Sequence, residues 1–238
     1  MRRWFNTAAL MLCLAPLVSK ANTVEFFQDP GGGGAFYGSG GGSLATHVTG
    51  GNPGQYRFVD FTVPAGPSWA IAYSTYLDLV FDPSTHGAVT GIDFSQDSKL
   101  FVATDPNGME SGLVLLQTPF TYFLKPAVLV TTGGWSTQTL TSLQPEDFVP
   151  FGGISFLEGY HPDFSANAPP MAFGFYQQLS HDPEVVRHFA AGFDNIRISV
   201  HYVPEPAGMM LVASACLGAW AIGCQRRGAI RSLRKLAN

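Results

Sequence analysis

Charged residues are scarce in this 238-residue sequence, because Asp, Glu, Lys and Arg make up only 13% of it. Aromatic residues also reach 13%. This composition excludes a coiled coil and a disordered acidic chain, which are rich in charge and poor in aromatic rings. All 17 acidic residues lie between positions 21 and 226, where the basic residues are only Arg57, Lys99, Lys125, Arg187 and Arg197. We call residues 22–203 the body of the chain. Its acidic character predicts no nucleic-acid partner, because nucleic-acid binding requires clustered Lys and Arg.

Cysteine is absent from residues 22–203, since the three cysteines are Cys13, Cys216 and Cys224. This interval therefore contains neither a disulfide nor a thiolate metal ligand. The six histidines show no His-Glu-x-x-His spacing, and the sequence has no Gly-x-Ser-x-Gly motif. These absences argue against a zinc protease and against a serine hydrolase of the usual kind.

Glycine and proline are plentiful, with 27 and 17 residues, and they separate short segments rich in Val, Phe, Tyr and Thr. Such segments, bounded by turn residues, are typical of β-strands. We expect strands at 24–28, 55–63, 70–81, 88–94, 100–104, 112–117, 122–131, 136–140, 153–157, 171–179 and 193–202. Gly31–Gly42 reads as a flexible glycine-rich loop, and only Pro183–Ala190 suggests a helical turn. The prediction is an all-β protein whose residues 22–202 form an antiparallel two-sheet, jelly-roll-like sandwich.

The first 21 residues have the order of a secretory signal peptide. Arg2 and Arg3 precede an apolar run at Ala8–Val18, and small residues then lead to a cleavage point after Ala21. Positive charge, a short apolar segment and small residues in this order predict removal by signal peptidase. The body is therefore expected to be exported through the inner membrane.

A second apolar segment, Ala207–Cys224, contains 18 residues without a charge. At ~1.5 Å per residue it would span about 27 Å as a helix, which is close to the thickness of a membrane's hydrocarbon core. Arg226 and Arg227 follow it, and basic residues beside a span favour the cytoplasmic side. We therefore expect a transmembrane helix at 207–224 and a basic cytoplasmic tail at 228–238.

The sequence Val203-Pro204-Glu205-Pro206, followed by this apolar segment and its arginines, resembles the PEP-CTERM sorting signal over residues 203–227. The resemblance implies that Pro204, Glu205 and Pro206 are recognised by an exosortase-type processing protease, and that Arg226 and Arg227 mark the end of a transient anchor. The chain continues to Asn238, farther than such signals usually extend. A permanently anchored single-pass surface protein is the alternative.

Several short fragments of the body resemble concanavalin- or laminin-G-like jelly-roll domains, among them Gly87–Asp97 and Gly192–Asn195. This resemblance implies a binding module. Sandwich folds also carry glycoside hydrolases, which require two carboxylates about 5 to 9 Å apart across the scissile bond. The adjacent pair Glu146-Asp147 follows Pro145, an arrangement more typical of a helical turn than of two catalytic strand positions. We therefore expect no enzyme, and a polysaccharide-acting glycoside hydrolase remains the alternative.

Candidate binding residues are of two kinds. Trp69 and Trp135 are the only tryptophans of the body, and an exposed ring can stack on a sugar; the tyrosines at 37, 56, 73, 76 and 160 are lesser candidates. Four acidic residues near turns offer oxygen ligands for a structural calcium ion: Asp93, Asp97, Asp105 and Asp194. No catalytic residue and no other cofactor is expected. The sequence thus predicts an exported cell-surface or extracellular-matrix protein that binds exopolysaccharide.

Overall fold

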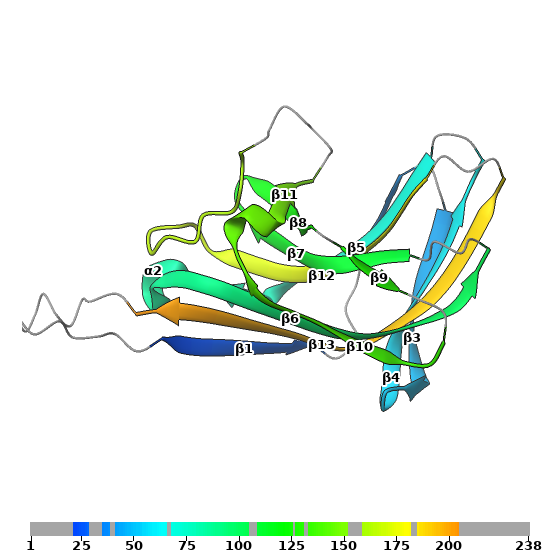
Figure 1. Ribbon diagram of the computed structural model, residues 1–238, viewed down its shortest axis with the longest axis horizontal. Coiled ribbons are helices and arrows are strands. Elements are labelled where there is room, and N and C mark those ends of the chain that lie inside the picture. Colours follow the sequence, from blue (N-terminus) through cyan, green and yellow to red (C-terminus); the bar gives the residue numbers. More distant parts are fainter. Residues whose placement is uncertain are drawn as a thin grey trace, which may run out of the picture. The chain divides into compact units, whose positions relative to one another are not determined.

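Two antiparallel sheets face each other in the computed structural model of the chain (Figure 1). The structure describes residues 21–28, 35–38, 41–65, 68–104, 109–125, 127–130, 133–151, 159–181 and 185–204. Within these, only the backbone is described at residues 28, 35–38, 41, 43–48, 68–70, 74–78 and 179–181. The residues from Ala21 to Val203 form one compact unit. The predicted antiparallel two-sheet sandwich is confirmed.

The first sheet, sheet A, has six strands in the order β10-β6-β13-β4-β3, and β1 also pairs with β13. Its strands are β1 (Asn22–Gln28), β3 (Gly41–Gly51), β4 (Gly54–Val63), β6 (Ala88–Ala103), β10 (Ser136–Leu143) and β13 (Arg187–Val203). Strands β1 and β4 bind successive halves of one edge of β13, which pairs with β1 over 196–202 and with β4 over 187–193.

The second sheet, sheet B, has seven strands in the order β11-β8-β7-β12-β5-β2, and β9 also pairs with β7. Its strands are β2 (Ala35–Gly38), β5 (Ser68–Phe81), β7 (Met109–Gln117), β8 (Phe120–Leu124), β9 (Val128–Val130), β11 (Phe148–Pro150) and β12 (Met171–His181). Two short helices, α2 (Pro83–His86) and the 3-10 turn Pro145–Asp147, lie between strands. The helical turn expected after Pro145 is therefore present.

Side chains that alternate along the strands fill the space between the sheets. On β13, Phe193, Ile198 and Val200 are buried, while Arg197 is exposed. Phe175 of β12 packs against Phe193, so the two sheets share one apolar core. This alternation fixes the register, because a shift by one residue would turn the apolar side chains of a strand toward solvent.

Four predictions about elements are wrong. The single strand expected at 122–131 is two strands, β8 and β9, which pair with different parts of β7. The two strands expected at 88–94 and 100–104 form one strand, β6, because its polar middle is accommodated in the interior: buried Gln96 bonds to Ser111 and Gln138. The turn expected at Pro183–Ala190 is not helical at Arg187–Ala190, which pairs with β4 as the start of β13. The loop expected at Gly31–Gly42 contains β2 and the first residues of β3, held by ladder pairing to β5 and β4. The strand expected at 153–157 lies outside the described residues.

No helix among the described residues is long and apolar enough to cross a membrane. The predicted signal peptide up to Lys20 and the predicted anchor at 207–224 both lie outside those residues, as does the basic tail at 228–238.

Candidate functional site

Four aromatic residues gather on the outer face of sheet A, the face that points away from sheet B. Tyr56 and Phe58 of β4 point outward because Arg57, between them, lies under the ring of Phe175 in the interior. Phe101 of β6 and Trp135, just before β10, complete the group. We call Tyr56, Phe58, Phe101 and Trp135 the aromatic platform.

The rings of the platform contact one another at their edges. The centroid of Tyr56 lies 5.4 Å from that of Trp135 and 5.7 Å from that of Phe101, and the Phe101 and Trp135 rings are 6.4 Å apart and nearly perpendicular. Phe101 is 40% exposed and Trp135 is half-buried, whereas Tyr56 is buried beneath them. The platform therefore presents the Phe101 and Trp135 rings to solvent on a fixed base.

Gly192 of β13 allows these rings to approach the sheet. A Cβ atom at this position would lie 2.7 Å from Tyr56 Cδ2 and 2.8 Å from Trp135 Cη2, closer than atoms of side chains pack. Lys99 of β6 is the ladder partner of Gly192, and its Nζ lies 5.1 Å from the centre of the Phe101 ring. A cation over a ring is attracted to its negative face, and here it places a hydrogen-bond donor beside an exposed aromatic surface.

The turn between β3 and β4 positions Trp135. The indole Nε1 donates a hydrogen bond of 3.1 Å to the carbonyl oxygen of Gly50 at the end of β3. Two residues farther along, the backbone N–H of Asn52 donates to Asp194 Oδ2 at 2.6 Å, and its Nδ2 donates to Asp97 Oδ2 at 3.1 Å. The carboxylates of β6 and β13 thus hold the turn that holds the tryptophan.

Asp97 and Asp194 occupy paired positions of β6 and β13 and are buried. Thr137 donates to the second oxygen of Asp97, while Asn195 donates its side-chain amide to Asp97 and its backbone N–H to Asp194. All four carboxylate oxygens accept hydrogen bonds, so the charges are compensated by amide and hydroxyl donors. This arrangement stabilises the turn between β3 and β4.

The structure brings two of the four predicted calcium ligands together. Asp97 and Asp194 lie together, Asp93 belongs to a different hydrogen-bond network, and Asp105 lies outside the described residues. Over the described ranges, no group of three or more His, Cys, Asp or Glu side chains is arranged to bind a metal ion. A calcium ion at Asp97 and Asp194 would have to displace the amide donors of Asn52 and Asn195.

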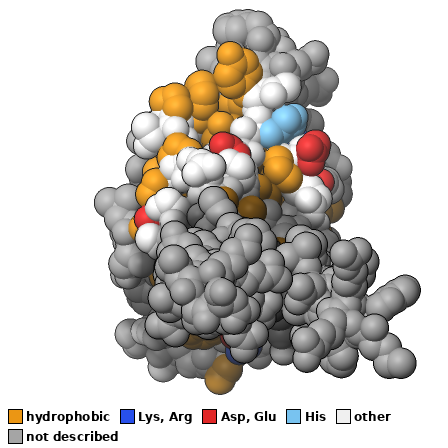
Figure 2. All heavy atoms as spheres, turned by 90° about the vertical axis from the view of Figure 1, so that its left-hand side faces the viewer, with side chains coloured by type: hydrophobic (Ala, Val, Ile, Leu, Met, Phe, Trp, Pro, Cys, Tyr) orange, Lys and Arg blue, Asp and Glu red, His pale blue; other side chains and the backbone are white. Residues whose placement is uncertain are grey.

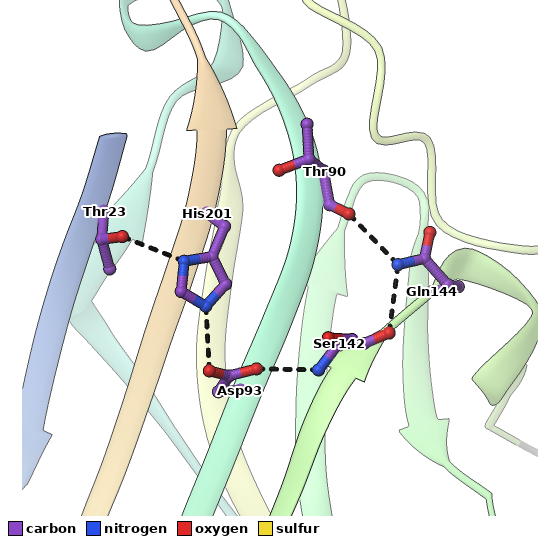
Figure 3. Close-up of polar contacts among 6 residues, drawn as sticks. All are labelled: Thr23, Thr90, Asp93, Ser142, Gln144 and His201. Atoms are coloured by element: carbon purple, nitrogen blue, oxygen red, sulfur yellow. Dashed lines mark hydrogen bonds and ion pairs between the residues drawn. The ribbon is translucent and has the colours of Figure 1, made fainter. Parts of the chain in front are cut away.

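A second polar network crosses the same face near the other end of β13 (Figure 3). His201 Nε2 lies 2.9 Å from Asp93 Oδ2, and its Nδ1 lies 2.9 Å from Thr23 Oγ1 on β1. The backbone N–H of Ser142 donates to Asp93 Oδ1 at 2.7 Å. Partial burial alone would raise the pKa of Asp93, but the hydrogen bonds from Ser142 and His201 and the charge of His201 outweigh it and lower that pKa. The network thereby joins β1, β13, β6 and β10.

Sheet B also carries outward-facing aromatic rings, but their central ring is buried. Tyr176 of β12 lies over Gly112 and stacks on Phe123 at 4.7 Å, and its hydroxyl donates to the carbonyl oxygen of Leu124 at 2.8 Å. Burial raises the pKa of Tyr176 well above its ordinary value. This cluster packs the sheet, whereas the platform on sheet A reaches solvent.

Hydrophobic and uncharged side chains make up most of the described surface at the end of the molecule that carries α2, with a few acidic groups and a histidine among them (Figure 2). Among the described side chains in that view, lysine and arginine are nearly absent. The surface therefore agrees with the acidic body expected from the sequence.

Of the other predicted site residues, some are described by the structure and some lie outside its described residues. Trp69 lies on β5 opposite Ser180, and its side chain is outside the described part of the chain. Ala21 is exposed directly before β1, and Pro204 directly follows β13. Glu205, Pro206, Arg226 and Arg227 lie outside the described residues. Sequence reasoning singled out Trp135 and included Tyr56 among the lesser candidates.

The residues that sequence reasoning missed are Phe58, Phe101, Lys99 and Gly192. Phe58 could have been found, because it alternates with buried positions on β4. Phe101 could not, because it lies at a break in the register between β6 and β13, where Ala190 pairs with Val102 but Ala191 pairs with Leu100.

No protein-family model matches the chain, and no curated protein is significantly similar to it. Among solved structures, it is similar to the family 11 carbohydrate-binding module from Clostridium thermocellum, with a TM-score of 0.44 and 12% identity over 73% of this chain and 94% of that one. It is also similar to the family 30 carbohydrate-binding module of a cellulosomal cellulase from Clostridium thermocellum, with a TM-score of 0.43 and 17% identity over 74% and 96% of the two chains. A third is the CBM22-1 xylan-binding domain from Paenibacillus barcinonensis Xyn10C, with a TM-score of 0.39 and 11% identity over 78% and 97%. Identities and scores this low establish nothing about the ligand of this chain.

Proposed function

We propose that the chain is a non-catalytic module that binds exopolysaccharide through the aromatic platform of sheet A. The observation that carries this proposal is the exposed ring of Phe101 beside the half-buried ring of Trp135, both of which pack on Tyr56. The C–H face of a pyranose ring packs against aromatic rings, while its hydroxyl groups require hydrogen-bonding partners at the edge. Lys99 supplies such a partner beside Phe101.

The composition of the face favours a sugar over a protein or nucleic-acid ligand. A protein-binding patch is usually much larger than the surface of one exposed and one half-buried ring. The acidic body disfavours nucleic acid. A polysaccharide, with alternating apolar faces and hydroxyl groups, complements a small aromatic surface within a polar sheet.

The absence of catalysis is part of the proposal, against the alternative of a glycoside hydrolase. Such an enzyme needs one carboxyl group to protonate the leaving oxygen and a second to act as nucleophile or base. Asp97 and Asp194 are paired across β6 and β13, but each of their oxygens already accepts a hydrogen bond. Their positions are explained by the turn that they stabilise.

We also propose that the chain is exported, processed by an exosortase-type protease at Pro204–Pro206 and released to the cell surface or matrix. The position of β1 supports this proposal, because it begins at Asn22, the residue that would follow cleavage after Ala21. The end of β13 at Val203 supports it equally, because the paired strands stop before the Pro-Glu-Pro stretch.

The test is binding of the full-length chain, purified in detergent, to soluble and insoluble polysaccharides by affinity electrophoresis and pull-down. We expect Trp135→Ala and Phe101→Ala each to weaken binding by about tenfold or more, which corresponds to ~1.4 kcal/mol. The matched control is Tyr160→Ala, because this ring is also exposed, at 50%, but lies outside the platform. Equal binding by all three variants would refute the proposed site, and glycan cleavage by the wild-type chain would refute the absence of catalysis.

A further inference from the structure

We propose that an open groove beside the platform is a second subsite of the same face, and that the two together bind an internal segment of a neutral, linear polysaccharide. This inference rests on the proposed function. The groove has a volume of about 450 Å³ and is lined by residues of four strands: Glu25, Phe26, Phe27, Asp93, Phe94, Ser95, Thr139, Arg197 and Ser199.

The strand register places the outward side chains of the groove in two rows. Phe27, Arg197, Ser95 and Thr139 are successive partners across β1, β13, β6 and β10. Glu25, Ser199 and Asp93 form the next row, across β1, β13 and β6. The small serines lie in the middle of the rows and the larger side chains toward β1, which produces the hollow.

The groove combines an exposed ring with hydrogen-bonding groups, as a sugar subsite requires. Phe27 is 55% exposed, and the guanidinium carbon of Arg197 lies 5.4 Å from its ring centre. Hydroxyls of Ser95, Ser199 and Thr139 donate or accept, and the carboxylate of Glu25 accepts. A small number of polar groups placed around an apolar contact fixes the orientation of a small ligand.

The charges of the groove select an uncharged ligand. Glu25 and Asp93 supply two negative charges, and Arg197 is the single cation among the lining residues. A polyuronate carries a carboxylate on each sugar unit, and the net negative charge of the groove would repel it. A neutral chain supplies only hydroxyl groups, which can donate to Glu25 and accept from Arg197.

The groove and the platform lie along the same two strands. On β6 the outward residue Ser95 of the groove precedes Asp97, and on β10 Thr139 follows Thr137, which bonds to Asp97. Outward positions two residues apart on a strand are separated by about 6–7 Å, so a step of this size leads from the groove to the cluster that positions Trp135. A ligand that contacts both regions must be a chain that continues past each of them.

The experiment measures binding of the full-length chain in detergent to gluco-, xylo-, manno- and galacto-oligosaccharides, each as a short and a long form, and to oligogalacturonate. The groove variants are Phe27→Ala and Arg197→Gln, with Ser199→Tyr to fill the hollow while a hydroxyl group is kept at this position. Glu110→Gln, an exposed change on sheet B, is the matched control. Thermal melting establishes that each variant is folded.

We expect one neutral series to bind, with the long form tighter than the short form in the wild type. The groove variants should lose this gain in affinity, which we expect to be about fivefold or more. They should bind the short form as tightly as the wild type does. If Trp135→Ala loses binding while all groove variants match the wild type, the groove is refuted and the proposed function stands. Binding of none of the series refutes both, and tighter binding of oligogalacturonate refutes the neutral class.

Discussion

At the residue scale, Gly192 determines how closely the Tyr56 and Trp135 rings approach sheet A. We expect Gly192→Ala to lower the free energy of unfolding by about 1–3 kcal/mol, the usual cost of overpacking, and to weaken polysaccharide binding by displacing Trp135. Gly134→Ala is the control, because a Cβ there meets open space. Urea unfolding measures both variants, and equal stabilities would show that the rings do not rest on Gly192.

The second residue-scale prediction concerns Asp93, whose pKa is lowered in the folded protein. Because the unfolded state then binds protons more readily, Asp93 stabilises the fold above its ordinary pKa, about 3.9, and this stabilisation is lost as the pH falls through the lower folded value. We expect Asp93→Asn to be less stable than the wild type at pH 6, by at most about 1 kcal/mol because the pair is partly exposed. Urea titrations from pH 7 to pH 3 should show the difference shrinking below pH 4. A difference that grows toward acid would contradict the role of the Ser142 and His201 hydrogen bonds.

At the element scale, the two phenylalanines of β1 have different roles, one in stability and the other in binding. Phe26 faces the interior 5.5 Å from Phe173, whereas Phe27 faces the groove. We expect Phe26→Ala to lower the free energy of unfolding by about 2–3 kcal/mol, below the cost for a fully buried ring. Phe27→Ala should change the stability little and remove the gain from long oligosaccharides. The reverse pattern, measured by urea unfolding and calorimetry, would place β1 in the opposite orientation.

Elements were predictable from sequence wherever apolar and polar residues alternate. The strand at 55–63 follows this rule from Val59 to Val63. The rule fails in the middle of β6, because the polar residues Gln96 and Ser98 are buried there and donate hydrogen bonds to Gln138. For the site, the Gly133-Gly134-Trp135 sequence indicated an exposed ring. Its partners Phe101 and Gly192 come from distant strands, and only the pairing of β6 with β13 brings them together.

At the scale of the whole molecule, the two predicted processing points lie at one end of a strand pair. Asn22, the first residue after the predicted signal cleavage, is paired with Tyr202, two residues before Pro204. Removal of the segments outside 22–203 would therefore break none of the strand pairings among the described residues, and the hydrogen bond between Thr23 and His201 would remain. The proposed export and anchor removal would thus leave the pairing of β1 with β13 in place.

This arrangement makes the mass of the exported protein the decisive measurement at this scale. We expect the protein recovered outside the cell to begin at Asn22 and to end between Pro204 and Pro206. Glu205→Ala should keep residues 207–238 and remain in the membrane fraction, because the protease would lose its recognition residue, whereas Glu146→Ala, an exposed glutamate of the body, should be released normally. A wild-type chain that keeps residues 207–238 in the membrane would instead make the protein a single-pass anchored sandwich, with the platform and the groove displayed on the cell that produces it.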